Sequence, residues 1–565
     1  MATVAKPAAP VLPAEYDRTF WSPITSWLTT TDHKLIAQMY MFTGFMSFIV
    51  AGIFALLMRV QLSVPNNTFI GDHEIYNQLM SAHGTTMIFF FTIPMMTGVM
   101  NYFVPLMVGA RDIAFPRVNA LGYWLIPVSI FIYYAGFFIP NNFASGDPSL
   151  ANAGWTGYPP LSDLKYNGSV GIDLWCVSIT ILGLSSIMAA VNFLTTILAL
   201  RAPGMKLTRL PLFVWASIST SILLLIATPS LAAGLILLLI DREFHTNFFT
   251  TAGRPVLFQH LFWFYSHPAV YIMILPGFGV ISEVIPVFSR KAIFGYESMV
   301  LALFGIVFLS LGVWAHHMFT VGLNIYVETL FMALTMAIAV PTGVKFFNWM
   351  GTAWDGAIEF KTPMKFAFGF LATFLIGGIT GIYLAAVPVD TQLHQSYYVV
   401  AHLHYVLFGG SVFTIFAGLY YWLPKITGRI LNERLGNWNF WTLFVGFNGT
   451  FLVMHTLGLD GMPRRIATYA RQDWAATNFV ITVSAFLIAA SVLIFVINVL
   501  YSRKRGELAG PDPWDGNSLE WSVSSPPPPY NFERIPEVHS REPWKDMKLA
   551  DRTAPPATPA PAPAH

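Results

Sequence analysis

Long apolar stretches, interrupted by short polar and basic connections, fill the chain between about residue 30 and residue 505. Twelve of them are long enough for a helix to cross the hydrocarbon core of a membrane, which takes about 20 residues. They run approximately from 36 to 60, 80 to 108, 119 to 140, 171 to 199, 211 to 240, 260 to 287, 297 to 318, 329 to 350, 366 to 387, 396 to 423, 438 to 459 and 477 to 502. The pattern predicts an all-α membrane protein, a bundle of twelve transmembrane helices.

The composition agrees with this class. Hydrophobic residues make up 55% of the chain and charged residues 11%, whereas about a quarter of the residues of soluble domains are charged. The formal net charge of +2 indicates no nucleic-acid partner, so membrane lipid is the expected surrounding. The single cysteine, Cys176, excludes an intrachain disulfide and a thiolate-ligated copper or iron–sulfur centre.

The apolar segments leave a short stretch before them and a longer one after them, and basic residues orient the chain in the membrane. We expect an N-terminal segment (1–30), a twelve-helix domain (31–505) and a Pro- and Ala-rich tail (506–565). Lysines and arginines occupy every second loop and follow the last helix, so the positive-inside rule places those loops and both termini in the cytoplasm. One loop on the other side of the membrane is an exception, because it contains Arg464 and Arg465. We expect these two cations to have an anionic partner. The tail is expected to be mostly unstructured, with one docked stretch from Trp514 to Trp521.

Two histidines, His402 and His404, lie in the apolar segment 396–423. Residues at i and i+2 lie about 200° apart around a helix, so these imidazoles point to opposite flanks and one helix can hold two separate groups. Imidazole is the commonest metal ligand, and an ionisable side chain in lipid is a candidate functional group. For a single such histidine, a hydrogen bond to a neighbouring helix is the favoured interpretation.

Further histidines favour the metal interpretation. His83, His267, His316 and His317 lie in three other segments, and all six imidazoles fall in the outer half of the membrane when the helices alternate up and down. Six independent hydrogen-bonding histidines at one depth would be a coincidence. Imidazole sites without thiolates or paired acids suit copper, zinc or haem iron.

The number of imidazoles allows more than one kind of site. A haem with two axial imidazoles is saturated, whereas a haem with one keeps an open face for a small ligand. His267, His316 and His317 could form an open copper site facing such a haem. Tyr271, one turn after His267 on the same helix face, could supply an electron and a proton together. Its spacing is equally consistent with an ordinary core tyrosine.

Four motifs carry a specific resemblance. They are His267-Pro-Ala-Val-Tyr271, Trp314-Ala-His-His-Met-Phe319, Val400-Ala-His-Leu-His404 and Gly461-Met-Pro-Arg-Arg465. With them the chain resembles subunit I of the haem-copper terminal oxidases, over roughly residues 30 to 505. The resemblance implies a proton-pumping cytochrome c oxidase of the aa3 type that reduces dioxygen to water. It also implies two haems, with type A favoured and types O and B left open, and one copper ion, copper B.

The resemblance assigns the ligands and their surroundings. It implies that His83 and His404 bind the low-spin haem iron, His402 the high-spin haem iron, and His267, His316 and His317 the copper. It also implies that Tyr271 is covalently joined to His267. Arg464 and Arg465 match residues that hold haem propionates, and paired guanidiniums suit carboxylates. Arg59 matches the arginine at the formyl group of the low-spin haem, although an interfacial anchor is an equally good interpretation.

Two proton paths follow from the same resemblance. The first comprises Lys345, Thr342, Ser282 and Tyr271. The second begins at Asp112 and continues along Asn101, Asn119, Asn192 and Ser185. From the residues alone, Lys345 could extend its amine to the interface, and each of the others could be an ordinary hydrogen-bonding helix residue.

The chain departs from the commonest family pattern at two positions. Ala269 replaces a glutamate two residues after His267, and Tyr265 and Ser266 resemble a prokaryotic subgroup in which hydroxyls replace that acid. Because Tyr265 is one turn before Ala269, its hydroxyl can reach the vacated space. Gln395 follows His394, where an aspartate commonly completes an outer magnesium site. A neutral amide is a poor ligand for a hard cation, which argues against magnesium at His394.

The electron donor and the partners are inferred last. Quinol-oxidising relatives carry Arg, Asp and His where this chain has Val50, Phe54 and Ile75, and only Gln78 of that set remains. This favours cytochrome c or another small carrier, with a copper A subunit II and a subunit III, in a bacterial plasma membrane. The alternatives are a quinol oxidase, a nitric oxide reductase and, from another class, a twelve-helix secondary transporter.

Overall fold

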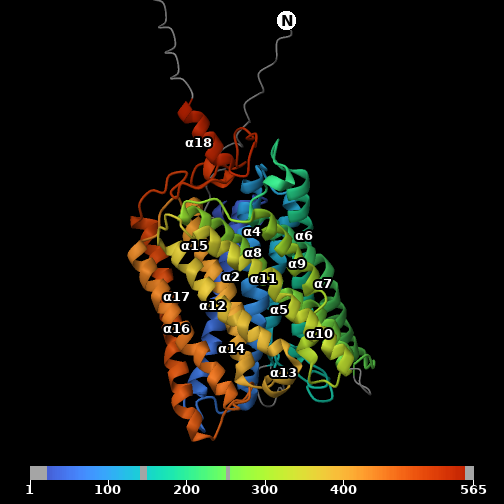
Figure 1. Cartoon of the computed structure of the whole chain (residues 1–565). Helices are drawn as coiled ribbons and strands as arrows, with labels where there is room; N and C mark the ends of the chain where they lie inside the picture. Colours follow the sequence, from blue (N-terminus) through green and yellow to red (C-terminus); the bar gives the residue numbers. More distant parts are fainter. Residues whose placement is uncertain (1–21, 140–148, 250–254, 554–565) are drawn as a thin grey trace, which may run out of the picture.

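The computed structural model describes residues 22–139, 149–249 and 255–553. Helices fill this part of the chain, and most of them run side by side in one bundle (Figure 1). The α-helices are α1 (Ser22–Thr29), α2 (His33–Gln61), α3 (His73–Thr85), α4 (Ile93–Val108), α5 (Pro116–Ala135), α6 (Val170–Ala199), α7 (Leu212–Phe244), α8 (Pro255–Ser289), α9 (Tyr296–Ser310), α10 (Ile325–Ala337), α11 (Ala339–Ala353), α12 (Thr362–Ala385), α13 (Val387–Leu393), α14 (Tyr397–Val406), α15 (Phe413–Thr427), α16 (Glu433–Leu459), α17 (Ala475–Arg505) and α18 (Pro543–Thr553). Shorter 3₁₀ turns are η2 (Leu207–Arg209), η3 (Trp314–Met318), η5 (Gln472–Trp474) and η6 (Leu519–Ser522), and π-helical turns are η1 (Thr86–Thr92) and η4 (Leu407–Val412).

Eleven helical stretches of the described chain are long and apolar enough to cross a membrane. They confirm an all-helical, multi-pass membrane protein and coincide with eleven of the twelve expected segments. The remaining segment, expected from 297 to 318, is not one continuous helix: α9 ends at Ser310 and the chain resumes as the 3₁₀ turn η3. The count of twelve spans therefore stays a prediction.

Three of the long spans change their winding inside the bundle. The span containing α10 and α11 is interrupted at Ile338, because Pro341 has no N–H to donate to the carbonyl of Ala337, four residues before it. The other two spans pass through η1 and η4. Each π-helical turn begins three residues after a histidine of interest, His83 or His404, and such turns are common at functional sites.

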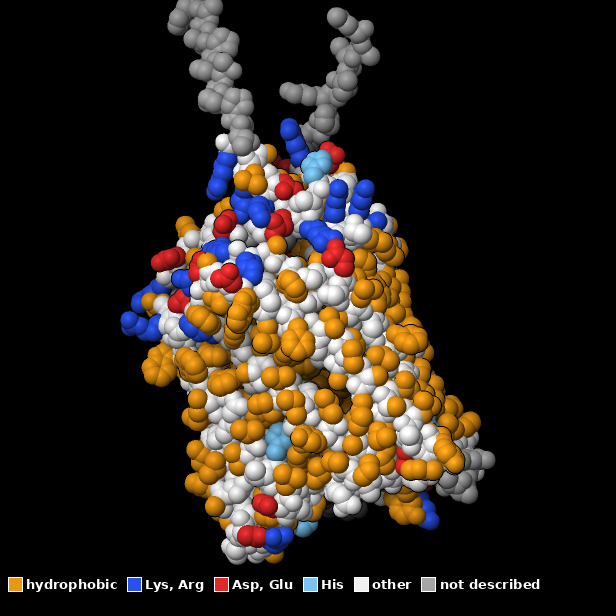
Figure 2. All heavy atoms as spheres, viewed as in Figure 1, with side chains coloured by type: hydrophobic (Ala, Val, Ile, Leu, Met, Phe, Trp, Pro, Cys, Tyr) orange, Lys and Arg blue, Asp and Glu red, His pale blue; other side chains and the backbone are white. Residues whose placement is uncertain are grey.

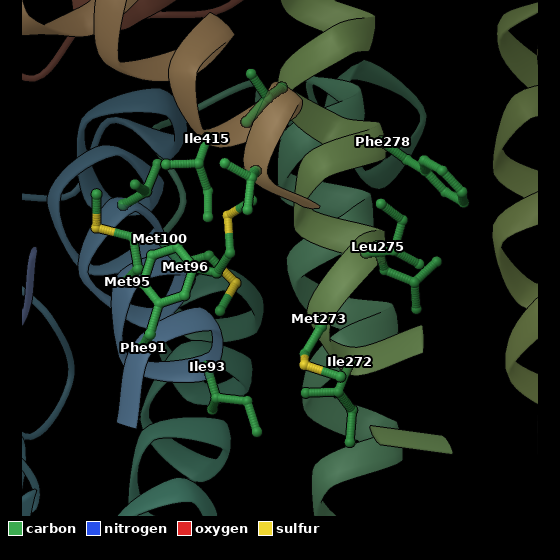
Figure 3. Packing of buried hydrophobic residues seen from close by; sticks show 14 of the residues in the cluster. Phe91, Ile93, Met95, Met96, Met100, Ile272, Met273, Leu275, Phe278 and Ile415 are labelled. Atoms are coloured by element: carbon green, nitrogen blue, oxygen red, sulfur yellow. The ribbon is translucent and has the colours of Figure 1, made fainter. Parts of the chain in front are cut away.

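Aromatic and methionine side chains fill the centre of the bundle. Figure 3 shows Met95, Met96 and Met100 of α4 beside Ile415 of α15, with α8 opposite. Methionine is flexible and fills irregular gaps between helices. Phe278 of α8 points away from this methionine cluster, toward α11 and α12, where its ring lies 5.5 Å from that of Trp349.

The outer surface is apolar along the bundle and charged at one end. Hydrophobic side chains cover its sides, and lysines, arginines and acidic residues gather around the end that carries α18 (Figure 2). Exposed examples are Leu301 and Phe308 on α9 and Phe347 on α11. Apolar side chains in this position suit contact with lipid chains.

The segment after α17 is ordered as far as Thr553, which corrects the expectation of a mostly unstructured tail. It crosses the end of the bundle where α2 begins (Figure 1). The amine of Lys425 donates to the carbonyls of Pro511 and Val523 at 2.7 Å each, and the indole of Trp514 donates to the carbonyl of Tyr421. Further along, the amide of Val538 donates to the carbonyl of Pro203. These hydrogen bonds satisfy polar groups of the Pro-rich segment between α17 and α18 and hold it against the bundle, although this segment has little helix besides the short turn η6.

Candidate metal centre

One cavity of about 1260 Å³ lies inside the bundle, and all six histidines expected from the sequence line it. It is larger than the roughly 300–1,000 Å³ of a typical small-molecule site. Three glycines on its wall, Gly52, Gly343 and Gly378, have nothing within 4 Å of the position where a Cβ would be. The cavity therefore has space for large flat groups against bare backbone.

Two cavity histidines form a facing pair. The rings of His83 on α3 and His404 on α14 are 6.3 Å apart between centres and only 12° from parallel. Each ring meets a backbone carbonyl through Nδ1, His83 at Ala51 (2.9 Å) and His404 at Val400 (2.8 Å). A carbonyl oxygen only accepts, so Nδ1 carries the proton and Nε2 keeps its lone pair. With metal–nitrogen bonds of about 2 Å, two imidazoles on opposite sides of one metal have ring centres about 6 Å apart, so this pair fits one metal.

His402 points to the other flank of α14, as the i, i+2 spacing indicates. Its Nδ1 lies 3.0 Å from the hydroxyl oxygen of Thr380 on α12. That hydroxyl donates to the carbonyls of Ile376 and Gly377, so it accepts the proton of Nδ1 and leaves Nε2 as a free ligand atom. A Cβ at Gly381 would be 3.0 Å from the His402 ring, so glycine is needed for this close approach.

The remaining three histidines form a separate cluster. Within the described chain, His267, His316 and His317 are the one group of three or more candidate ligands whose ligand atoms all lie within 4.8 Å of one another. Nδ1 of His267 is 3.2 Å from Nε2 of His317. Two nitrogens bound to one tetrahedral ion at about 2 Å are roughly 3.3 Å apart, so this distance fits a shared metal. Nε2 of His267 is buried and has no hydrogen-bond partner among the described residues.

Neighbouring side chains orient the two histidines of η3. Nδ1 of His316 lies 3.0 Å from the hydroxyl of Thr335 on α10, which itself donates to the carbonyl of Phe331. The ring of His317 stacks on Trp263 of α8, with 3.7 Å between centres and 9° between planes. No sequence pattern links Thr335 or Thr380 to its histidine, because each threonine lies on a different helix from the histidine that it orients.

Four other histidines belong to membrane-long stretches but lie outside the cavity, His33 and His73 as the first residues of their stretches and His260 and His455 further in, which corrects the count of six. His260 on α8 accepts a hydrogen bond from the indole of Trp314, and His455 on α16 meets the carbonyl of Leu452 at 3.3 Å. Both belong to stretches long enough to cross the membrane. Depth alone therefore does not identify a ligand; convergence on one cavity does.

Some of the residues around Ala269, where the chain departs from the family pattern, line the cavity, and others pack in the core. Tyr271 lines the cavity, and its ring centre is 4.9 Å from that of His267. Ser266 and Ala269 also line it, and the Ser266 hydroxyl is buried without a partner among the described residues. Tyr265 packs instead against Phe89, with 6.4 Å between ring centres. Its expected role in the space beside Ala269 stays a prediction.

Arg59 brings unused donors to the cavity. Its Nη2 donates to the backbone and side-chain oxygens of Asn478 on α17, at 3.1 and 2.9 Å, and to the hydroxyl of Thr482. Nε and Nη1 are buried without partners within the described chain, and the residue lines the cavity. Buried donors are nearly always satisfied, so an acceptor on a bound group fits here.

Arg464 and Arg465 line the cavity, and neither forms an ion pair within the described chain. Burial and the neighbouring Arg465 lower the pKa of Arg464 to about 10, and Nε of Arg464 donates to the side-chain oxygen of Gln395. His394, beside them, meets a carboxylate oxygen of Asp390 at 2.7 Å. Adjacent guanidiniums that form no ion pair within the described chain suit an anionic group in the cavity.

The residues expected on the lysine path lie near one another but are not continuously bonded. Lys345 on α11 is 1% exposed, and its amine lies 4.2 Å from the ring centre of Phe278 and 5.5 Å from that of Trp349. The indole of Trp349 donates to the hydroxyl of Ser282 at 3.0 Å. Thr342 and Tyr271 line the cavity above them. Within the described chain no hydrogen bond joins the amine to these hydroxyls, so relay along them requires water.

The residues expected on the Asp112 path form a polar file between α4, α5 and α6. The side chains of Asn101 and Asn119 exchange two hydrogen bonds, at 2.6 and 3.1 Å. Asn192 pairs with both backbone groups of Phe115, and Ser185 donates to the carbonyl of Gly122. Asp112 lies in the loop before α5, where burial raises its pKa to about 6.

Comparisons with known proteins agree with this geometry. Residues 35–487 match the family described as cytochrome c and quinol oxidase polypeptide I. Cytochrome c oxidase subunit 1 of Synechocystis sp. is 50% identical over 531 residues, 94% of this chain and 94% of the relative. That of Bacillus sp. strain PS3 is 47% identical over 539 residues, 94% of this chain and 86% of the relative. A solved haem-copper terminal oxidase dimer shares the fold, with a TM-score of 0.71 at 20% identity over 83% of this chain and 84% of that chain.

Proposed function

The chain belongs to the family of polypeptide I of the cytochrome c and quinol oxidases, as the catalytic subunit of a cytochrome c oxidase, and on that premise we propose which of its residues do the work. In such an enzyme two haems and one copper, when bound, pass electrons to dioxygen and reduce it to water. Everything else depends on how this chain holds those groups and supplies protons.

The observation that carries the proposal is the near-parallel pair His83 and His404, which shares one cavity with the three-histidine cluster. His83 and His404 hold a saturated low-spin haem, and His402 holds a high-spin haem from the opposite flank of the same helix. His267, His316 and His317 hold copper B. One helix, α14, would thus carry a ligand for each of the two haems.

Tyr271 lies beside the three-histidine cluster, where its phenol would supply a proton and an electron. Its cross-link to His267 would use Nε2 of that ring, which has no partner in the described chain. Ser266 and Tyr265 deliver protons toward this face in place of a carboxylic acid. Since a phenol has a pKa of about 10, they relay protons with water and do not store them.

The arginines position the haems. Arg464 and Arg465 bind propionates, which would give these adjacent cations of the cavity wall the ion pairs that they lack within the described chain. The free Nε and Nη1 donors of Arg59 bind the formyl oxygen of the low-spin haem. A formyl group distinguishes haem A from haems O and B, so these orphan donors favour haem A.

Protons enter by two routes from the end that carries the tail, which we place in the cytoplasm of a bacterium whose plasma membrane holds twelve spans of this chain. One route begins at Asp112 and follows Asn101, Asn119, Asn192 and Ser185. The other runs through Ser282, Lys345, Thr342 and Tyr271. Electrons come from cytochrome c through a copper A subunit II, with a subunit III alongside. We propose no magnesium ion at His394, because Gln395 is held by Arg464.

The test is metal and pigment analysis of the complex purified with its companion subunits. We expect this chain to contain two haem irons and one copper ion. A pyridine extract should have the spectrum of haem A. His402→Ala should remove the high-spin haem and oxygen consumption together. Absence of either metal, or respiration that survives His402→Ala, contradicts the assignment.

A further inference from the structure

Asn531, in the tail, is completely buried at the end of the bundle where α2 begins. Its amide nitrogen donates to the carbonyl of Ala110 at 2.9 Å, and its amide oxygen accepts from the amine of Lys34 at 3.2 Å. The same amide meets Nε2 of His33, at 2.9 Å from the nitrogen and 3.2 Å from the oxygen. One tail side chain therefore ties together α2 and the loop after α4.

This contact continues directly into the polar file that leads from Asp112. Nδ1 of His33 lies 2.8 Å from the carbonyl oxygen of Asn101, so this nitrogen carries the proton and Nε2 accepts from Asn531. The side chain of Asn101 is paired with that of Asn119. A hydrogen-bonded series thus runs from the tail through His33 to the paired amides.

Asp112 lies against the same group. It follows Ala110 by two residues, and Asp32, His33 and Lys34 are the neighbours that act on its carboxyl group from α2. The amine of Lys34 is itself held by Asp32 (3.2 Å), by Asn531 and by the carbonyl of Pro529 (2.7 Å). The charged and titratable groups around this mouth are therefore fixed in part by two residues of the tail.

The backbone at Asn531 restricts what can stand there. Its φ is +60°, a left-handed conformation that asparagine, aspartate and glycine tolerate and other residues rarely adopt. The tail does not need this side chain to stay docked, because Trp514, Lys425 and Val538 hold it elsewhere. A strained, buried polar residue in such a place is a candidate functional position.

We propose that Asn531 is a positioning residue of the proton entrance: its amide holds His33, Lys34 and the Ala110 carbonyl around Asp112, so that the tail completes the mouth of this path. The inference rests on the proposed role of Asp112. Asn531 transfers no proton itself; it fixes the groups between which water and protons must pass.

Two substitutions remove the amide while keeping the backbone conformation possible. Asn531→Gly deletes the side chain, and Asn531→Asp keeps its shape but replaces the donor to Ala110 and His33 with a carboxylate. Asp515→Gly is the matched control, because Asp515 is another left-handed tail residue (φ +55°) that is tied to Lys548, away from the mouth. The complete complex is reconstituted in phospholipid vesicles and driven by reduced cytochrome c.

In both Asn531 variants we expect turnover to fall at least about threefold, within the roughly hundredfold that a small misplacement can cost. The number of protons translocated per electron should fall as well, while the KM for cytochrome c and the iron and copper contents stay unchanged. Asp515→Gly should match the wild type in all four measurements.

Two results would overturn the inference. If Asn531→Gly and Asp515→Gly behave alike, the residue is only a clip for the tail. Asp112→Asn, measured in parallel, separates the two levels of the argument. If Asp112→Asn impairs proton translocation but neither Asn531 variant does, the positioning role fails and the path stands; if Asp112→Asn also has no effect, the proposed path fails with it.

Discussion

The facing pair His83 and His404 and the imidazoles around the open site are oriented by different means. Each ring of the facing pair gives its Nδ1 proton to a backbone carbonyl. At the open site, His402 and His316 rely on the hydroxyls of Thr380 and Thr335. Both arrangements select Nε2 as the ligand atom, but a main-chain carbonyl cannot be removed by substitution, whereas a threonine hydroxyl can.

This difference shows at which of the two sites a single substitution can change the orientation of the histidine ligands. The facing pair is fixed as soon as α2, α3 and α14 pack, because its acceptors belong to every possible sequence. The open site depends on two side chains from α10 and α12. Groups that orient a ligand set its basicity and tautomer, so single substitutions can adjust the open site and leave the facing pair unchanged.

The largest effect should come from removing a ligand on either side of the comparison. His404→Ala should abolish the low-spin haem, and His317→Ala should abolish copper binding with both haems retained. Either should reduce turnover more than about a hundredfold, since loss of an orienting residue alone costs up to that. Haem spectra and copper content check this.

His455→Ala is the matched control for these ligand variants, because His455 is buried on a spanning helix but lies outside the cavity. It should keep iron, copper and both haem bands. Equal metal loss in all three variants would mean that misfolding, and not ligation, explains the result.

A smaller effect should follow from the threonines. Thr335→Val keeps the shape but leaves Nδ1 of His316 without an acceptor, and Thr380→Val does the same to His402. We expect losses of about 10- to 100-fold in turnover, or in copper affinity for Thr335→Val, with recovery in the serine variants. Thr373→Val is the control, because Thr373 is buried on α12 and bonds only backbone carbonyls. If it is as damaging as Thr380→Val, the hydroxyl has no special part at His402.

At the facing pair, the corresponding side-chain test is Asn478→Leu, which removes an acceptor from Nη2 of Arg59. Because backbone carbonyls orient the two histidines, both haems should be retained. Turnover should fall only a few-fold, which corresponds to the net free energy of about one hydrogen bond. The low-spin haem absorption band should shift as Arg59 moves. Loss of the haem in this variant would show that the facing pair depends on side chains after all.

The smallest effect should appear far from both sites, at Asp112. Burial raises the pKa of its carboxyl to about 6, above its value of about 3.9 in an unfolded chain. The folded protein thus favours the protonated form, and the stability this provides is complete below about pH 4 and is lost as the pH rises through about 6. Asp112→Asn lacks the titration, so the variant should gain in unfolding temperature relative to wild type between about pH 4 and about pH 7. A difference that is constant over that range would contradict the burial of this carboxyl.

Much of the fold follows from segment length and hydrophobicity. Eleven spans coincide with the expected apolar segments, and a docked stretch of the tail around Trp514 was also expected. The break at Ser310 and the π-helical turns η1 and η4 were not foreseen, because they depend on packing between helices and not on local pattern. The tail was underestimated, because its proline-rich chain is held by donors such as Lys425 that lie far away in the sequence.

The candidate site divides in the same way. The six cavity histidines were found because intramembrane histidines are costly and therefore rare. His260 and His455 show that the same signal also marks residues outside the cavity. The threonines behind His316 and His402, and Asn478 behind Arg59, lie on other helices, so no spacing rule links them to the residues they hold.

Asn531 and His33 are separated by 498 positions along the chain. The ribosome therefore synthesises all the membrane helices before it synthesises Asn531, which packs against the start of α2. Until that last stretch emerges and docks, the nascent protein has its spans but not its finished inlet, so an incomplete product lacks the full entrance.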